Sequence, residues 1–313
     1  MTENRAARHE VIVVGGGAAG LSAALVLGRA RRRTLVVDAG EPRNTPSPHM
    51  QGYLTRDGMS PADFLAAGRE EIARYGVELV RDRVVDASRD EDGFTVVLAG
   101  GDTARARQLV VATGLRDELP PLPGLAERFG RDVLHCPYCH GWEARDLPTG
   151  VLAASALGVH QALMVTQWSK DVRLFLHLVP EAELADEDLR RLAAAGVEVV
   201  PGEVAGLVVA GDRLTGVRLA DGTVHDREVL YAAPRPVPRN ELFVRLGAEL
   251  RETPFGAYPV IDERGLTSVP GLWAAGNASG FAEQVVNAAS RGYRAGAAIN
   301  GELLFADLDA ALG

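Results

Sequence analysis

The two cysteines of this 313-residue chain are separated by only two residues, in the segment HCPYCHGWE at 135–143. Two cysteines placed at random would have this spacing on the order of 1 time in 150, so the spacing needs a cause. A CxxC pair is typical of a redox-active dithiol or of half a metal site, and CxxCH is also the attachment signature of c-type haem.

The residues around the pair favour thiol chemistry. Pro137 directly follows Cys136 and fits the first position of a helix that Cys136 would cap. A helix N-terminus lowers the pKa of a cysteine from about 8.5 into the range of about 3.5 to 7.5, which supplies thiolate near neutral pH. His140 can take a proton from an incoming thiol, because its ordinary pKa of about 6.5 lies near working pH; its alternative role is structural packing. The catalytic candidates are Cys136, Cys139 and His140.

Haem and metal binding have less support. Haem attachment requires an export signal and an axial ligand, and neither is evident in the sequence. Zinc needs two further ligands, and His135 and His140 lie too close in sequence to be convincing partners of the cysteines. We therefore expect no metal site. His135, Tyr138 and Trp142 are expected to serve as packing or pocket wall.

A nucleotide cofactor is indicated by the start of the chain. Residues 10–16 are a short β-branched run, 18–30 have helical spacing, and 33–40 form a second strand. The first turn reads Gly15-x-Gly17-x-x-Gly20, and Asp38 closes the second strand. In this context the glycines allow a tight turn, close approach of a pyrophosphate and helix packing, while the acid can accept hydrogen bonds from a ribose.

A second unit of the same kind is predicted inside the first. Residues 150–178 have weak similarity to residues 10–40. Proline-rich segments occur at 119–124 and 233–240 and mark the predicted domain boundaries. The predicted fold class is α/β, with two Rossmann-like, doubly wound nucleotide-binding domains, the second inserted in the first. The predicted boundaries are 1–117 for the first part of the outer domain, 118–236 for the inserted domain and 237–313 for the remainder.

Charge and hydropathy exclude several classes of partner. The net charge of −9 argues against nucleic acid and against an anionic membrane surface. No stretch approaches about 18 uninterrupted apolar residues, so no membrane span is expected. Arg5 and Arg8 precede an apolar run that faintly resembles a signal peptide, but three glycines interrupt it. We expect a cytoplasmic protein, where a dithiol persists only if it is redox-active.

Four ordered motifs carry a family resemblance. They are GxGxxG with Asp38, ATG at 112–114, CxxC at 136–139, and GLWAAGN at 271–277 followed by EQVVNAA. Their order and spacing resemble the low-molecular-weight thioredoxin reductases over essentially the whole chain. The resemblance implies a homodimeric flavoprotein with an FAD-binding domain in two pieces and an inserted domain that carries the CxxC.

The resemblance also implies the residues that contact FAD. The matching positions are Gly15, Gly17, Ala19, Gly20, Asp38, Gly40, Asn44, Val84, Ala112, Thr113, Gly114, Gly276, Asn277, Glu283, Gln284 and Val285. Asn277 stands where the family has Asp. The amide can still form hydrogen bonds, but the negative charge is lost. The segment from Glu283 to Val285 matches a helix start that points at the flavin, where a reduced anionic flavin gains from the helix N-terminus.

The inserted domain departs from the family at its NADPH site. The family has a second GxGxxA turn and an HRR segment for the 2′-phosphate. The aligned positions here read Ala153-Ala154-Ser155, with Gly158 at the packing position, and His-Leu-Val at 177–179. A Cβ at the close-approach position obstructs a pyrophosphate, and loss of both arginines removes bidentate phosphate contacts. The sequence thus predicts a lost site; the alternative is nicotinamide binding in another mode.

The phrase HCPYCHGWE is similar to a subgroup, the FAD-dependent dithiol oxidases that close disulfides in natural products of the gliotoxin and holomycin type. This implies Cys139 beside the flavin, Cys136 facing substrate, and O2 as electron acceptor, giving H2O2. The substrate can be a small dithiol, a peptide or a thioredoxin-like protein. Alternatives are a disulfide reductase supplied by NADPH, ferredoxin or another flavoprotein, and a non-catalytic FAD sensor.

Overall fold

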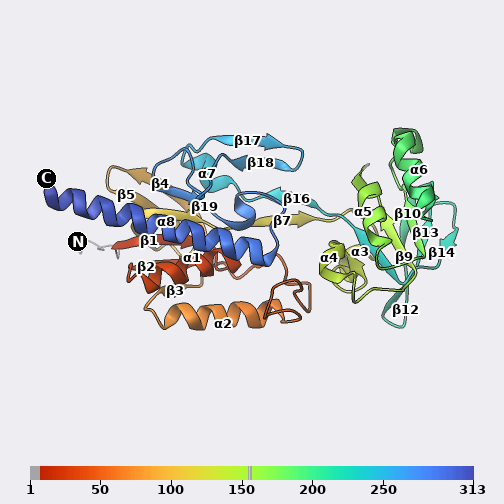
Figure 1. Cartoon of the computed structure of the whole chain (residues 1–313), viewed down its shortest axis with the longest axis horizontal. Coiled ribbons are helices and arrows are strands. Elements are labelled where there is room, and N and C mark those ends of the chain that lie inside the picture. Colours follow the sequence, from red (N-terminus) through yellow and green to blue (C-terminus); the bar gives the residue numbers. More distant parts are fainter. Residues whose placement is uncertain (1–7, 154, 156) are drawn as a thin grey trace. The chain divides into compact units, whose positions relative to one another are not determined.

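The chain folds as two compact units in the computed structural model, which describes residues 8–153, 155 and 157–313 (Figure 1). The first unit comprises Met1–Thr45, Met59–Arg116 and Pro236–Gly313, and the second comprises Pro46–Gly58 and Asp117–Arg235. The predicted boundaries at 117/118 and 236/237 lie one residue away from these. The segment Pro46–Gly58 was expected with the first unit and instead groups with the second.

A mostly parallel sheet forms the centre of the first unit. Its order is β3-β2-β1-β6-β5-β4, and β19 also pairs with β6. Strands β1, β2, β3, β6 and β19 run parallel, whereas β4, β5 and β6 form an antiparallel meander. The bounds are β1 Arg8–Val14, β2 Thr34–Val37, β3 Glu78–Val80, β4 Val84–Asp90, β5 Gly93–Leu98, β6 Thr103–Val111 and β19 Leu272–Ala274. The central strands are near-continuous apolar runs because both faces of the sheet are covered.

Two helices pack tightly on one face of this sheet. Helix α1 (Ala18–Arg29) lies beside the long helix α8 (Val285–Leu312) (Figure 1). A Cβ on Gly292 would overlap the backbone of Ala19, and a Cβ on Gly296 would overlap Val26. Glycine on α8 therefore permits the close approach of the two helices. The other elements of the unit are α2 (Pro61–Ala73), α7 (Glu241–Arg245), η2 (Gly276–Ala278) and the hairpin β17 (Leu250–Thr253) and β18 (Gly256–Pro259).

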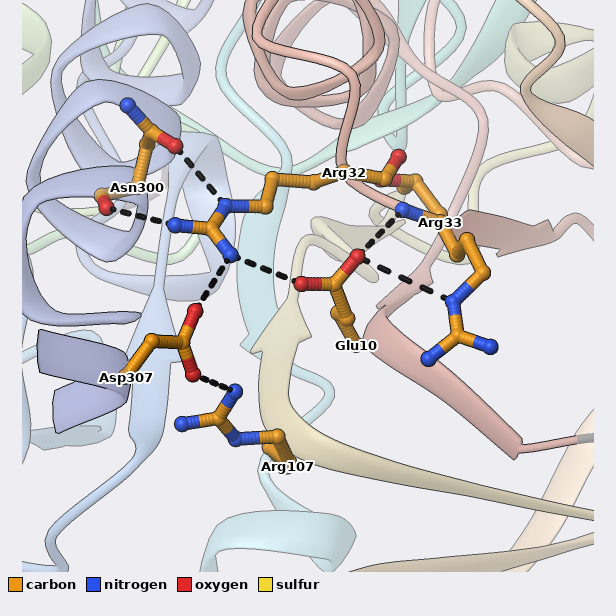
Figure 2. Close-up of polar contacts among 7 residues, drawn as sticks. Glu10, Arg32, Arg33, Arg107, Asn300 and Asp307 are labelled. Atoms are coloured by element: carbon orange, nitrogen blue, oxygen red, sulfur yellow. Dashed lines mark hydrogen bonds and ion pairs between the residues drawn. The ribbon is translucent and has the colours of Figure 1, made fainter. Parts of the chain in front are cut away.

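An ion-pair network fixes α8 to the sheet (Figure 2). The Arg32 guanidinium donates to Glu10 Oε1 at 2.8 Å, to Asp307 Oδ2 at 2.9 Å and to Asn300 Oδ1 at 2.9 Å. Burial tends to raise the pKa of Glu10, but hydrogen bonds from Arg33 and Arg32 outweigh it and hold that pKa below its ordinary value. The network joins β1, the start of β2 and the C-terminal half of α8.

The second unit is built on an all-parallel sheet of order β11-β10-β9-β15-β8. Its strands are β8 Val133–Leu134, β9 Thr149–Leu152, β10 Val172–Phe175, β11 Glu198–Val200 and β15 Val229–Ala232. A three-stranded antiparallel sheet adds β12 Val204–Ala210, β13 Arg213–Leu219 and β14 Val224–His225. The helices are α3 Leu125–Arg128, α4 Pro137–His140, α5 Leu157–Val165, η1 Glu181–Glu183 and α6 Asp186–Ala194. The predicted α/β class with two Rossmann-like units is confirmed.

The chain passes between the units along β7 (Leu115–Glu118) and β16 (Arg235–Pro238), which pair with each other. Both strands lie at the ends of the proline-rich segments that marked the predicted boundaries. Within the described part of the chain, no helix is both long and apolar enough to cross a membrane.

Replacing Arg32 by alanine should destabilise the first unit. Its side chain is only 12% exposed and its loss leaves Glu10, 14% exposed, with a weakened set of partners. We expect the free energy of unfolding to fall by about 2–3 kcal/mol, measured by urea unfolding followed by circular dichroism. The matched control is Arg105→Ala, which removes a more exposed pair with Asp90 and should cost less than about 1 kcal/mol. Equal losses in the two variants would contradict the assigned role of the network.

Candidate active site

The predicted glycine turn of the first unit has the backbone geometry of a nucleotide cradle. Gly15 has a φ of +108°, and a Cβ there would overlap the carbonyl of Ala112. A Cβ on Gly20 would overlap the carbonyl oxygen of Gly15. At Gly17, in contrast, no atom of the described chain lies within 4 Å of the position that a Cβ would take. The first and third glycines are thus required by the protein's own packing, and the second leaves the backbone open to an incoming group.

Two helix starts in this unit offer backbone donors. Gly17 is the N-cap of α1, and neither a capping side chain nor a first-turn acid is found there among the described residues. The same holds for α8, whose N-cap is Gln284. The first amides of a helix need acceptors from outside the helix, and they carry the positive end of its dipole. Both starts suit an anionic cofactor such as a dinucleotide pyrophosphate.

Several predicted cofactor residues meet around the α1 start. A Cβ on Gly276, which has a φ of +66°, would lie 2.8 Å from Ala19 Cβ and 3.6 Å from Ala288 Cβ. The contacts of Gly276 place η2 and the first turn of α8 beside the start of α1. The close approach of Gly15 to Ala112 places the end of β6 beside the same glycine turn. Thr113 donates its hydroxyl to the Arg239 carbonyl at 3.2 Å. Next to it, Gly114 has a φ of +70°.

Asp38 is held at the end of β2 by three donors. Its Oδ1 accepts from the amides of Gly16 at 3.1 Å and Gly40 at 3.2 Å, and its Oδ2 accepts from Arg81 Nη1 at 2.7 Å. Sequence reasoning missed Arg81, although a basic residue directly after β3 was available as a signal. Its side chain is 52% exposed, so it can move to share the carboxylate with a ribose.

The remaining predicted cofactor residues are less directly connected. Asn277 Nδ2 donates to the Gly280 carbonyl at 3.0 Å, and Glu283 accepts from Arg291 at 2.6 Å. Gln284 and Val285 begin α8. Val84 packs on the core of the β4–β6 meander. The contacts described for the chain do not join Val84 or the half-buried Asn44 to the glycine turn.

The CxxC segment forms the predicted helix start, with Cys136 as the N-cap of α4 and Pro137 as its first residue. The helix is too short for a strong dipole at its N-terminus. The amide of Cys139 donates to the Cys136 carbonyl at 3.1 Å. Both thiols are half-buried and are not joined in a disulfide. Because α4 has a single turn, its dipole is small, and the predicted lowering of the cysteine pKa by a helix N-terminus has little support in the structure.

His140 is oriented by a segment distant in sequence. Its Nε2 lies 3.2 Å from Ser47 Oγ, and Ser47 donates to the His49 carbonyl at 2.6 Å. Nδ1 of the same ring is buried and has no partner among the described residues. Burial lowers the pKa of His140, against the opposing effects of the Cys136 backbone and Glu143. A neutral imidazole with one unused nitrogen is what a general base requires.

Tyr231 lies close to the dithiol and was not predicted. It is 1% exposed, and β15 places it opposite Leu134, two residues before Cys136. Burial raises the pKa of Tyr231, and the negative charges that Cys136, Glu143 and Cys139 can carry raise it further. The phenol therefore stays neutral and can donate a hydrogen bond. Its only sequence signal is one hydroxyl in the buried apolar run VLYAA.

Two aromatic side chains form an exposed rim beside the cysteines. Tyr138 is 72% exposed and meets Trp168 edge-on, and Trp142 is 66% exposed beneath the Arg145 guanidinium. They were predicted as packing or pocket wall, and their exposure fits a wall open to solvent better than core packing. His135 offers its backbone carbonyl to Gln161 Nε2 at 2.6 Å.

The second nucleotide-binding turn keeps its packing and loses its ligand features. A Cβ on Gly158 would lie 2.8 Å from Ala153 Cα, so this glycine still serves close helix packing. Ala153 is buried and Ser155 is exposed; Ala154, the middle residue of the predicted turn, lies outside the described residues. At the former HRR positions, His177 Nδ1 accepts from the Val204 amide, and Leu178 is exposed. Burial lowers the pKa of His177, which favours its neutral form.

Comparisons with known proteins agree with this arrangement. Residues 9–292 match the family model of pyridine nucleotide-disulphide oxidoreductases. The thioredoxin reductase sirT of Leptosphaeria maculans is 32% identical, with 96% of each chain covered. The crystal structure of HlmI superposes with a TM-score of 0.92 at 48% identity, covering 100% of this chain and 97% of that one. An oxidoreductase from Agrobacterium tumefaciens gives a TM-score of 0.89 at 38% identity, covering 96% and 99%.

The glycine turn, the open backbone at Gly17 and the uncapped helix starts fit a bound dinucleotide, and the half-buried CxxC fits exchange with a disulfide. The chain belongs to the pyridine nucleotide-disulphide oxidoreductases, and within them it is a thioredoxin reductase-like, FAD-dependent oxidoreductase.

Proposed function

We propose that the chain is a dithiol oxidase, which converts the dithiol of a small molecule or peptide into a disulfide and passes the electrons through FAD to O2, giving H2O2. The observation that carries the proposal is the contrast between the two nucleotide-binding turns. The first keeps the open glycine and the acid at β2. The second has Ala153 and Ser155 at glycine positions, and Leu178 and Val179 where phosphate-binding arginines belong. An enzyme without a pyridine nucleotide must take its electrons from another donor, and a dithiol substrate is such a donor.

A disulfide reductase is the second candidate function. The relatives from Leptosphaeria maculans and Claviceps purpurea carry the name thioredoxin reductase, and the second relative is 33% identical over 96% of this chain. In that case the electrons flow from NADPH, ferredoxin or another flavoprotein to a disulfide substrate. A thioredoxin-like protein is one such substrate. The chemistry at Cys136 and Cys139 is the same in reverse.

We assign the binding of FAD to the first unit. Gly15, Gly17 and Gly20 with the start of α1 receive the pyrophosphate, and Asp38 receives the adenosine ribose. The further members of the cofactor site are Ala19, Gly40, Asn44, Val84, Ala112, Thr113, Gly114, Gly276, Asn277, Glu283, Gln284 and Val285. Bound FAD would accept the electron pair of the reduced cysteines and would then supply that pair to O2.

The chain's own residues perform the exchange steps. His140 takes the proton of one substrate thiol, and the resulting thiolate attacks Cys136 of the Cys136–Cys139 disulfide. The disulfide breaks, and Cys139 leaves as a thiolate near the neutral Tyr231 phenol. His140 passes its proton to solvent and then takes the proton of the second substrate thiol, which attacks the substrate sulfur of the mixed disulfide and releases Cys136 as a thiolate. The substrate has then lost two electrons and two protons, and the cysteines hold the two electrons.

We also propose that the protein is a cytoplasmic homodimer, as the family resemblance implies. A dithiol that cycles between thiol and disulfide is compatible with a reducing compartment. Light scattering should give twice the chain mass of 33.2 kDa, and a value equal to one chain would reject the dimer.

Replacing Gly17 by valine should strongly weaken FAD binding and leave the fold intact. The new side chain enters open space, and the φ of −79° suits any residue. Loss of charge-assisted bonds to the pyrophosphate corresponds to at least about 10–100-fold weaker binding, measurable by flavin fluorescence on reconstitution. Gly301→Val is the matched control, because a Cβ there also meets open space, on α8. Retention of FAD by the Gly17 variant would contradict the assigned cradle.

Anaerobic mixing should separate the dithiol oxidase from a reductase that uses NADPH. We expect dithiothreitol to bleach the flavin absorbance of the oxidised enzyme within the stopped-flow time range. NADPH and NADH should bleach it slowly or not at all, because the second turn lacks the phosphate contacts. Rapid bleaching by NADPH would favour the reductase instead.

A Cys136→Ser variant should keep FAD and lose turnover. The hydroxyl cannot form the mixed disulfide, so we expect O2 consumption with dithiothreitol to fall by more than about 1,000-fold. The flavin spectrum of the purified variant serves as the control for folding and cofactor content. Turnover at the parent rate would show that the exchange mechanism is wrong.

A further inference from the structure

A short hydrogen-bond chain ends on the imidazole of His140. Ser47 Oγ lies 2.6 Å from the His49 carbonyl oxygen and 3.2 Å from His140 Nε2. A serine hydroxyl has one hydrogen and a carbonyl oxygen has none. Ser47 must therefore donate to His49, and its oxygen can only accept from His140. The Nε2 atom of His140 consequently carries a hydrogen.

This arrangement selects one tautomer of the neutral ring. With Nε2 protonated, the lone pair of neutral His140 lies on Nδ1. That atom is buried and meets no partner among the described residues. An unsatisfied buried acceptor costs about 1–3 kcal/mol, and such groups in native structures call for a functional explanation.

The ring is also placed next to the dithiol. His140 directly follows Cys139 and lies four residues after Cys136, so it shares the face of α4 with Cys136. Burial favours its neutral form, while the Cys136 backbone and Glu143 favour the protonated form. A proton taken up at Nδ1 therefore meets an environment that stabilises the resulting cation.

The segment that carries Ser47 is fixed to the second unit, although Ser47 and His140 are 93 residues apart in sequence. Gln51 Nε2 donates to Glu143 Oε1 at 3.0 Å. Within the segment, the Gly58 amide donates to the Met50 carbonyl at 2.9 Å, and Asp57 accepts from the Gly52 amide at 2.7 Å. The carbonyl that orients Ser47 is thus itself held in place.

We propose that Ser47 is a positioning residue that keeps His140 in the Nε2-protonated tautomer, so that Nδ1, once substrate binding uncovers it, takes the proton of the substrate thiol. The proposal rests on the proposed exchange function. In the step, the S–H bond breaks and an Nδ1–H bond forms, and the thiolate attacks Cys136. The imidazolium later returns the proton to the Cys139 thiolate or to solvent.

The test measures the single-turnover rate at which dithiothreitol reduces the oxidised, FAD-loaded enzyme, as a function of pH. Ser47→Ala should react about 10–100-fold more slowly near pH 7. The deficit should shrink as the pH approaches the pKa of the dithiol, because an ionised thiol needs no base. Ser47→Thr, which keeps the hydroxyl, should restore the rate.

Asp57→Ala is the matched control for the segment, because it breaks an internal hydrogen bond without touching His140. Its pH profile should follow the parent. An unchanged profile in Ser47→Ala, or the same pH-independent loss in both variants, would overturn the proposal.

A second measurement is independent of the reaction. Nitrogen-15 NMR of labelled histidines, with His140 assigned through a His140→Gln variant, should show an unprotonated Nδ1 in the parent and a tautomer mixture in Ser47→Ala. A protonated Nδ1 in the neutral parent ring would overturn the proposal. Failure of dithiothreitol to react with the parent, together with the expected NMR result, would reject the exchange function and leave the tautomer assignment standing.

Discussion

In the first unit, the backbone of Gly20 approaches the Gly15 carbonyl so closely that Gly20 has no room for a side chain, and the Ala112 carbonyl excludes one at Gly15. This approach lets α1 begin directly above the end of β1. Glycines of α8 and η2 then allow these elements to pack onto α1 in turn. The result is a turn in which backbone amides, rather than side chains, are left to receive an anionic ligand. Backbone donors suit a pyrophosphate because they are held in place by the helix that they begin.

The second unit keeps the packing of a nucleotide-binding unit and differs from the first at the positions that would face a ligand. Its parallel sheet and the glycine that packs α5 against β9 are retained, since the core depends on them. The positions that would face the nucleotide hold Ala153, Ser155, Leu178 and Val179 instead of glycines and arginines. A fold survives such a change because packing and ligand binding use different atoms of the same turn. The unit's remaining chemistry is that of the CxxC segment.

The redox site gathers its acid–base groups from distant parts of the chain. The cysteines and His140 come from α4, Ser47 from a segment near the N-terminus, and Tyr231 from β15. The single turn of α4 supplies little dipole, and burial favours the neutral forms of His140 and Tyr231 beside the cysteines. The arrangement keeps nucleophile and base together on α4, and Ser47 contacts the imidazole from outside the helix.

The sequence by itself determined the features that depend on neighbours along the chain. The glycine fingerprint with Asp38, the CxxC with Pro137, and the missing arginines at 177–179 are local patterns, because a turn or a cap is fixed by a few consecutive residues. The two-unit organisation followed from repeated strand–helix–strand spacing. Only the tertiary structure decided that Pro46–Gly58 joins the second unit and that Arg81, Ser47 and Tyr231 reach the sites. These contacts link residues tens of positions apart, and each partner has an ordinary local sequence. A pattern within one window cannot specify such pairs, since their meeting depends on the order of strands and on how the chain returns to them.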